Sequence, residues 1–368
     1  MRVSFAKVLG ILLAFPVAAF AVEPETAGRV MLGQPTPAWF LIKGSSGSYL
    51  YDGDTGDMQG LISHDWYTPA IEPNIDKGEF YLAESFYSRG VRGTRTDVVT
   101  IVDLETLSTR SEIAIPAKTA PAALRHYIGL LGDRRHLAVF NMTPAQSVSI
   151  VDVVDLRFVG EVSTPGCAII MPTGDRAFAM ICGDGTLQLI GLDEEGKEAS
   201  RNRSKSFFVV EEDPVIALPL ETEDGWLLVT HDGRAFDVNV KEQEIRVGLP
   251  WWLISEEDRS ERWRPGGAQP LTLHRRTNLL YVLMHQGAVD THGEPGTEIR
   301  IIDTARRRAI GRLDLESPAN HILVSDEAQP KLYVFGGDGK LHIHDALTLA
   351  RLRTIDEPGP GPSLLQGL

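Results

Sequence analysis

The chain repeats a unit of short β-strands, and this repetition limits its possible folds more than any other feature of the sequence. The clearest copy spans 331–355, where a strand, the turn Gly337-Asp338-Gly339, a second strand ending at Asp345 and a third strand follow one another. His321–Val324 supplies a preceding strand, which makes four strands in the unit. Other strand segments of this kind are 48–52, 98–103, 148–152, 187–190, 235–238 and 299–303.

The copies number seven, at intervals of about 40 to 65 residues. Turns such as Gly183-Asp184-Gly185 and Asp232-Gly233 supply the residues that tolerate the positive φ of tight hairpins. Four-stranded units at this spacing are typical of a β-propeller. We therefore predict an all-β fold, a seven-bladed β-propeller formed by residues 22–368 as a single domain, whose two ends meet to close the ring. One short helix is predicted, over Ser255–Arg262 in an insertion, with Ser255 as its N-cap.

The acidic composition narrows the possible functions. The 368 residues include 36 Lys and Arg against 50 Asp and Glu, a formal net charge of −14. Proteins that bind nucleic acid normally present a basic surface, so we predict no nucleic-acid partner. Beyond the N-terminal region no apolar run reaches the roughly 18 residues that a membrane span needs, so no membrane association is predicted.

The first 21 residues have the order of parts found in secretory signal peptides. Arg2 and Lys7 form a positive region, Val8–Phe15 is a short apolar stretch, and Ala19-Phe20-Ala21 is a small-x-small cleavage motif. We predict a signal peptide at residues 1–21, with a buried N-terminal helix as the alternative. The mature chain is therefore expected in an exported compartment, where disulfides are tolerated.

The two cysteines, Cys167 and Cys182, lie in strand-like segments on either side of the turn sequence Pro172-Thr173-Gly174-Asp175. Antiparallel pairing of these strands would bring the sulfur atoms together, so we predict a structural disulfide. Such a bridge, closing a loop of about 15 residues, stabilises a protein by roughly 3 kcal/mol. A metal or redox pair is the alternative, which the spacing and the absence of nearby His ligands disfavour.

Common motifs for catalysis or metal binding are absent. The sequence has no Gly-rich phosphate loop, H-E-x-x-H or G-x-S-x-G motif. His342 and His344 share one strand face and could form a two-ligand arm, but an ordinary polar strand face is the simpler interpretation. The acidic runs 211–213 and 256–258 lack the order of a Ca²⁺-binding loop. We predict no metal, and a Ca²⁺-dependent propeller hydrolase is disfavoured because no pattern of inward carboxylates is visible.

Large aromatic residues lie outside the repeated strands, at Trp39-Phe40, Trp66-Tyr67, Trp251-Trp252 and Trp263. Two interpretations stay open at this point. These side chains are either buried under loops, or they form a partner surface with aromatic anchors.

Several motifs together resemble one known family. Ser85-Phe86-Tyr87-Ser88-Arg89, followed by Gly93-Thr94-Arg95-Thr96-Asp97-Val98-Val99, resembles a segment of amine dehydrogenase heavy chains, the large subunits of methylamine and aromatic amine dehydrogenases. The resemblance runs in order over nearly all of the mature chain. The further matching segments are Asn141–Ala145, Cys167 and Cys182 with Gly183–Gly185, Trp263–Gly267, His274-Arg275, Leu279–Leu283 and Leu341–Ala346.

The resemblance implies a periplasmic heavy subunit with the fold of a seven-bladed propeller. It implies an α2β2 heterotetramer with a small, disulfide-rich light chain, on which two tryptophans form the cofactor tryptophan tryptophylquinone. A small primary amine would be oxidised there to an aldehyde with release of ammonia, and electrons would pass to a blue copper protein of the amicyanin or azurin kind. With two cysteines this chain does not fit the light chain, so neither a bound cofactor nor a catalytic residue is expected in it.

Two residues are assigned from the resemblance. Phe40, in the segment Thr36–Phe40, fits the place of a family Phe that lines the channel to the quinone, and Tyr87 is expected to face the light chain. The alternative function is a stand-alone periplasmic propeller that binds a ligand or another protein.

Overall fold

The computed structural model describes residues 31–118, 120, 122–241, 243–359 and 361–368. The chain divides into Met1–Met31 and Leu32–Leu368, of which the second is described over nearly all of its length. The predicted signal peptide, residues 1–21, lies outside the described residues. Among those residues, no helix is both long and apolar enough to cross a membrane.

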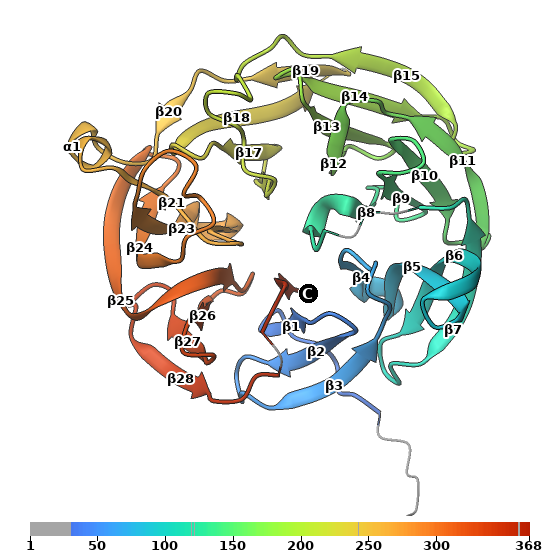
Figure 1. Cartoon of the computed structure of the whole chain (residues 1–368), viewed down its shortest axis with the longest axis horizontal. Helices are drawn as coiled ribbons and strands as arrows, with labels where there is room; N and C mark the ends of the chain where they lie inside the picture. The colour runs from blue at the N-terminus through green and yellow to red at the C-terminus, as the bar shows by residue number, and fades with distance from the viewer. Residues whose placement is uncertain (1–30, 119, 121, 242, 360) are drawn as a thin grey trace, which may run out of the picture. The chain divides into compact units, whose positions relative to one another are not determined.

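Antiparallel sheets stand around a ring in Leu32–Leu368 (Figure 1). In the first two sheets the strands are β29 (Leu364–Gly367), β1 (Trp39–Lys43), β2 (Gly47–Asp52) and β3 (Met58–Ser63), then β4 (Ile71–Asn74), β5 (Glu79–Arg89), β6 (Arg92–Asp103) and β7 (Thr109–Ile115). In the next two they are β8 (Ile128–Leu130), β9 (His136–Asn141), β10 (Ser147–Asp152) and β11 (Arg157–Ser163), then β12 (Cys167–Thr173), β13 (Ala177–Cys182), β14 (Leu187–Leu192) and β15 (Glu198–Arg203).

Two larger sheets complete the ring. The five-stranded sheet contains β16 (Leu220–Glu221), β17 (Trp226–Val229), β18 (Arg234–Lys241), β19 (Glu244–Val247) and β20 (Trp251–Trp252). The eight-stranded sheet contains β21 (Trp263–Pro265), β22 (Leu271–His274), β23 (Leu279–Gln286), β24 (Gly296–Asp303), β25 (Arg308–Val324), β26 (Lys331–Gly336), β27 (Leu341–Asp345) and β28 (Arg351–Ile355). The helices are η1 (Ile75–Lys77), η2 (Arg125–Tyr127), α1 (Glu256–Ser260) and η3 (Arg275–Thr277).

The predicted all-β propeller is confirmed, but hydrogen bonding does not divide it into seven separate sheets. Among the described residues five sheets have four or five strands and one has eight. The difference arises at β25, which is 17 residues long. Its first half pairs with β24 and its second half with β26, so one strand joins two groups of strands.

Burial explains why these segments form a ring of sheets. The middle strands β9 and β10 are buried along their whole length, whereas the outer strand β15 is mostly exposed. A strand that is apolar on both faces needs a packing partner on each side. Neighbouring sheets supply these partners, as where Phe140 and Ile150 of one sheet share a hydrophobic cluster with Phe178 and Met180 of the next.

The two ends of Leu32–Leu368 meet as predicted. β29 pairs antiparallel with β1, with Ile42 opposite Leu365, and so fills the innermost position of the first sheet. The side chain of Gln269 donates to the Leu365 carbonyl at 2.9 Å and accepts from the Leu365 backbone N–H at 2.8 Å. On the other side, the Gln366 side chain bonds to the backbone of Ile71.

The short helix predicted in the insertion is present as α1. Ser255 caps it, and its side chain accepts a hydrogen bond from the Asp258 backbone N–H at 3.1 Å. The Asp258 carboxylate accepts from the Ser255 backbone in return, which makes a reciprocal capping box. Arg300 pairs with the same carboxylate at 2.7 Å and ties the helix to β24.

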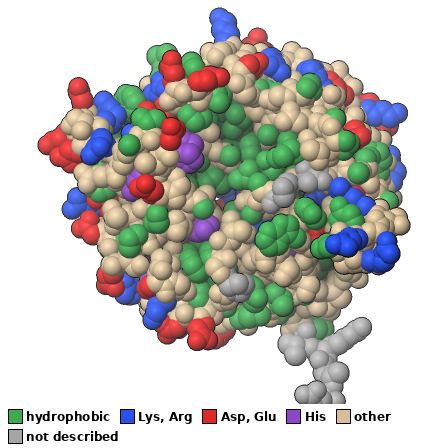
Figure 2. All heavy atoms as spheres, in the orientation of Figure 1, with side chains coloured by type: hydrophobic (Ala, Val, Ile, Leu, Met, Phe, Trp, Pro, Cys, Tyr) green, Lys and Arg blue, Asp and Glu red, His purple; other side chains and the backbone are tan. Residues whose placement is uncertain are grey.

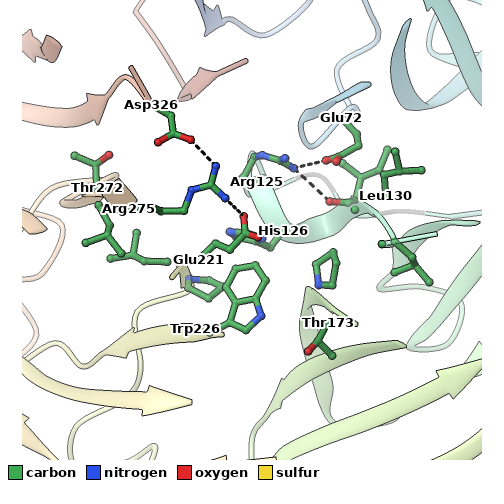
Figure 3. Close-up of a pocket in the computed structure, with 18 of the residues that line it drawn as sticks. Glu72, Arg125, His126, Leu130, Thr173, Glu221, Trp226, Thr272, Arg275 and Asp326 are labelled. Carbon is green, nitrogen blue, oxygen red and sulfur yellow. Dashed lines mark hydrogen bonds and ion pairs between the residues drawn. The ribbon is translucent and has the colours of Figure 1, made fainter. Parts of the chain in front are cut away.

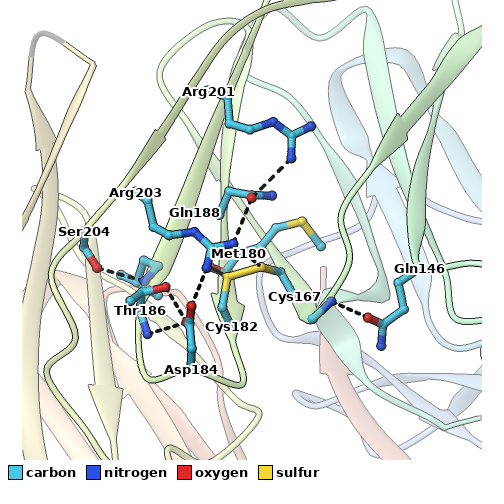
Figure 4. Close-up of a disulfide and its surroundings, with 12 residues drawn as sticks. Gln146, Cys167, Met180, Cys182, Asp184, Thr186, Gln188, Arg201, Arg203 and Ser204 are labelled. Atoms are coloured by element: carbon cyan, nitrogen blue, oxygen red, sulfur yellow. Dashed lines mark hydrogen bonds and ion pairs between the residues drawn. A yellow bond between two sulfur atoms is a disulfide. The ribbon is translucent and has the colours of Figure 1, made fainter.

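The predicted disulfide is confirmed. Cys167 of β12 and Cys182 of β13 are paired opposite each other and are bonded through their sulfur atoms (Figure 4). Both side chains are buried, and Arg203 approaches the Cys167 sulfur at 3.6 Å. The bridge therefore links two neighbouring strands of one sheet.

Replacing both cysteines, Cys167→Ala with Cys182→Ala, is expected to lower the free energy of unfolding by about 3 kcal/mol, because the bridge closes a loop of about 15 residues. Denaturant unfolding followed by circular dichroism measures the change. Chemical reduction of the disulfide in the wild-type protein should lower the free energy of unfolding by a similar amount. An unchanged midpoint in both tests would show that the bridge does not stabilise the fold.

Candidate functional site

The ring has two faces with different loops. We call the face on which the innermost strands begin the hairpin face, and the opposite one the turn face. The hairpin face carries the segments 64–70, 86–95, 204–219, 248–262 and 287–295. The turn face carries the segments 75–78, 131–135, 174–176, 222–225 and 325–330. The segments on the hairpin face are longer than those on the turn face. They are longer than is needed to connect the strands, so part of their surface is available for other contacts.

Exposed aromatic side chains lie on the hairpin face. Trp66 is 65% exposed, Phe86 42% and Trp252 39%. By contrast Trp39 and Trp251 are buried, so the aromatic segments noted in the sequence divide between core and surface. Figure 2 shows hydrophobic side chains gathered toward the centre of this face and charged side chains mostly around its rim. An apolar centre with a polar rim is typical of a protein interface.

A polar network holds the β5–β6 hairpin, which carries Phe86 and Tyr87. The Ser85 hydroxyl donates to Asp97 Oδ1 at 2.6 Å, and Arg95 donates to both carboxylate oxygens of Asp97 at 2.7 Å. The Arg95 guanidinium also lies 6.0 Å from the centre of the Tyr87 ring. A bidentate pair fixes the orientation of both side chains, so Arg95 and Asp97 hold the β5–β6 hairpin in place.

Lys118 links this network to the loop that carries Trp66. Its side chain is fully buried, and its Nζ donates to the Tyr67 carbonyl at 3.1 Å. Its backbone N–H donates to Asp97 Oδ1 at 3.2 Å. Burial lowers the pKa of Lys118 to about 8, although the carboxylates of Asp65 and Asp97 act in the opposite direction.

The structure does not bring the two predicted site residues together. Tyr87 is half-buried on the hairpin face, beside exposed Phe86. Phe40 lies near the start of β1, toward the turn face, and is fully buried. Its ring packs 4.3 Å from the ring of Tyr333 and 5.7 Å from that of Tyr51, centre to centre, as part of the core.

The metal candidates noted in the sequence have other partners. One ring nitrogen of His342 lies 3.2 Å from Thr354 Oγ1 and the other 3.1 Å from Asp338 Oδ2, while His344 Nδ1 lies 3.1 Å from the Leu349 carbonyl. In the acidic runs, Asp213 pairs with Arg234 at 2.8 Å. Over the part of the chain that the structure describes, no three His, Cys, Asp or Glu side chains form a group that could hold a metal ion.

Sequence reasoning missed a cavity of about 520 Å³ at the centre of the ring, open on the turn face (Figure 3). Glu72, Arg125, Glu221, Arg275 and Asp326 are among its lining residues. They come from segments far apart in the sequence and follow no local motif. No pattern within a single repeat could therefore have indicated it.

A closed ring of antiparallel sheets, with long loops and exposed aromatic residues on one face, defines a β-propeller with a surface suited to a protein partner. The family model described as methylamine dehydrogenase heavy chain (MADH) matches residues 27–367. The chain belongs to this family.

Relatives named methylamine dehydrogenase heavy chain agree with this membership. The one from Methylobacillus flagellatus is 28% identical over 352 residues, which cover 93% of this chain and 85% of the relative. The one from Paracoccus versutus is 28% identical over 358 residues, covering 95% and 81%.

Solved structures share the fold alone. Hydrazine synthase of Kuenenia stuttgartiensis has a TM-score of 0.57 at 12% identity, covering 89% of this chain and 99% of that one. The Cps50 (Swd1) β-propeller domain of Myceliophteria thermophila has a TM-score of 0.58 at 9% identity, covering 86% and 95%.

Lys118→Met tests the cost of the buried amino group. Between pH 8 and 10.5 the folded wild type binds fewer protons at Lys118 than the unfolded chain does, so its stability rises with pH. The variant lacks this contribution. Its stability relative to wild type is therefore expected to fall by on the order of 3 kcal/mol as pH rises through this window.

Denaturant unfolding at several pH values measures the effect. Lys77→Met, at an exposed lysine, is the control for loss of a positive charge. If the difference in the free energy of unfolding between Lys118→Met and wild type does not change with pH, the pKa of Lys118 is not lowered in the folded protein.

Proposed function

We propose that this chain is the heavy subunit of a periplasmic amine dehydrogenase and carries no cofactor itself. Family membership over residues 27–367 is the observation that carries the proposal. The two cysteines are bonded to each other, so neither is left to bridge a partner chain. In this proposal the signal peptide directs the chain to the periplasm, where its light chain joins it in an α2β2 heterotetramer.

The quinone chemistry belongs to the light chain in this proposal. Tryptophan tryptophylquinone there would take two electrons and two protons as a small primary amine and water become an aldehyde and ammonia, and the electrons would leave to a blue copper protein. Among the described residues, one of this chain's tryptophans, Trp226, packs its ring against another aromatic ring. That ring belongs to His126 and not to a second tryptophan. The heavy chain's part is to bind and orient the light chain and to keep water from the interface.

The light chain is proposed to dock on the hairpin face. The support is the exposure of Trp66, Phe86 and Trp252 there, and the network around Asp97 that holds the hairpin in place. Tyr87 is kept as an interface residue because it neighbours Phe86. The channel role of Phe40 stays a prediction from the resemblance. Its ring is fully buried against Tyr333 in the core.

The propeller is proposed to have seven blades. The eight-stranded sheet counts as two blades that share β25, one half paired with β24 and the other with β26. A hydrophobic cluster supports the division, because Tyr281 and Ile299 of the first half pack against Ile322 and Leu332 of the second. Residues in one continuous flat sheet would not form such a face-to-face core.

Native purification tests the function. The complex, isolated from the source periplasm, is expected to contain a second, smaller chain and to show a visible quinone band that bleaches when a primary amine is added. A lone, colourless chain of about the mature mass would contradict the proposal. That outcome would favour the alternative, a stand-alone periplasmic propeller that binds a ligand or another protein.

Phe86→Ala is expected to weaken binding of the light chain by about fivefold to thirtyfold, because an exposed aromatic anchor at an interface contributes on the order of 1 to 2 kcal/mol. Ile75→Ala removes a comparably exposed side chain on the turn face and is the matched control. Calorimetry or surface binding with the isolated light chain measures both. Equal affinities for the two variants would place the interface elsewhere.

A further inference from the structure

The cavity at the centre of the ring has the features of a small-ligand site. Its walls include residues of the innermost strands β4, β8, β12, β16, β22 and β25. The turn η2 contributes Arg125 and His126, which Figure 3 shows within the ring of lining residues. A smaller cavity of about 150 Å³ shares both residues and extends along β29.

One side of the cavity carries an excess of positive charge. Arg125 donates from Nη1 to Glu72 Oε2 at 2.6 Å. Arg134 donates from Nη2 to the neutral Asn74 side chain at 2.7 Å. Its other partner, Asp76, is 3.3 Å away, exposed to solvent and not part of the lining, so their attraction is screened. The lining on this side therefore includes two arginines, Arg125 and Arg134, and a single carboxylate, Glu72.

The other side carries an excess of negative charge. Arg275 donates to Glu221 Oε2 at 3.0 Å and to Asp326 Oδ2 at 2.6 Å, so one lining guanidinium serves two lining carboxylates (Figure 3). Arg276 also lies 4.0 Å from Asp326 Oδ1, but it is exposed to solvent and not part of the lining, so this attraction is screened. The lining as a whole holds three Arg against three acidic residues, which gives no net charge but a separation of charge across the cavity.

Hydrogen-bonding groups remain for a ligand. Among the described residues Arg125 donates only from Nη1, to Glu72 and to the Ile128 carbonyl at 3.5 Å, so its Nε and Nη2 have no protein acceptor. Within the described part of the chain, Glu221 accepts through Oε2 alone, which leaves Oε1 available. A ligand with both a carboxylate and an ammonium group can use both sides at once.

The remaining walls are apolar. Leu130, Pro172, Leu220 and Leu323 line the cavity together with Trp226. The His126 ring meets the Trp226 ring edge-on, with 5.4 Å between centres. Burial lowers the pKa of His126 to about 3, so this imidazole adds no charge at neutral pH.

We propose that this cavity binds a small zwitterion of the α-amino acid class with an apolar side chain. Its carboxylate binds beside Arg125 and Arg134, its ammonium group binds beside Glu221 and Asp326, and its side chain packs on the leucine-lined wall. A simple anion or cation satisfies only one side of the cavity. A ligand without net charge also avoids long-range repulsion from the protein's net charge of −14.

Three probes, a zwitterion, an anion and a cation with branched apolar groups, test the charge requirement by isothermal titration calorimetry on the full chain in its native assembly. They are L-leucine, 4-methylpentanoate, which lacks the amino group, and tert-pentylamine, which lacks the carboxylate. The last has no α C–H bond and so cannot be oxidised to an aldehyde. L-leucine is expected to bind at least about tenfold more tightly than either analogue. Failure of L-leucine to bind, or equal binding of an analogue, would overturn the proposal.

A pair of variants locates the binding. Glu221→Gln removes a lining carboxylate and is expected to weaken L-leucine binding about fivefold or more. Glu316→Gln breaks a surface pair with Arg351, 2.9 Å apart and away from the cavity, and is expected to bind L-leucine as wild type does. Circular dichroism melts confirm that both are folded. Unchanged binding in Glu221→Gln, or equal loss in both variants, would contradict this site.

Discussion

Closure of the ring by the C-terminal strand is the constraint on which the rest of the structure depends. β29 completes the first sheet by pairing with β1, and Gln269 and Gln366 tie it to the sheets on either side. Hydrophobic clusters lie between neighbouring sheets, as where Phe40 and Tyr333 meet across the two ends of the chain. Because each sheet needs a neighbour on both faces, the core between the first and last groups of strands forms only when the ring closes.

Closure also separates two surfaces with different chemistry. The hairpin face carries exposed Trp66, Phe86 and Trp252, and buried polar contacts around Asp97 position the β5–β6 hairpin that carries Phe86. The turn face opens into a cavity whose walls carry opposite charges. A rigid scaffold with loops on one side lets the same fold hold a partner while its centre remains open to small molecules.

Local features could be predicted from the sequence because their partners are close along the chain. The strand repeats, the Cys167–Cys182 bridge and the Ser255 cap all depend on residues within about one repeat of each other. Neighbouring side chains of a strand point to opposite faces. This alternation could have predicted that one tryptophan of β20 is buried and the other exposed, as is found for Trp251 and Trp252.

Features that join distant sheets could not be predicted in this way. No motif indicates that Phe40 and Tyr87 lie toward opposite faces, or that Glu72, Arg125 and Arg275 share one cavity. Hydrogen–deuterium exchange on the full chain, with and without its light chain, tests the assignment of the two faces most directly. We expect protection at 64–70, 86–95 and 248–262, with the turn-face segments 75–78 and 222–225 unchanged. Protection confined to the turn face would contradict it.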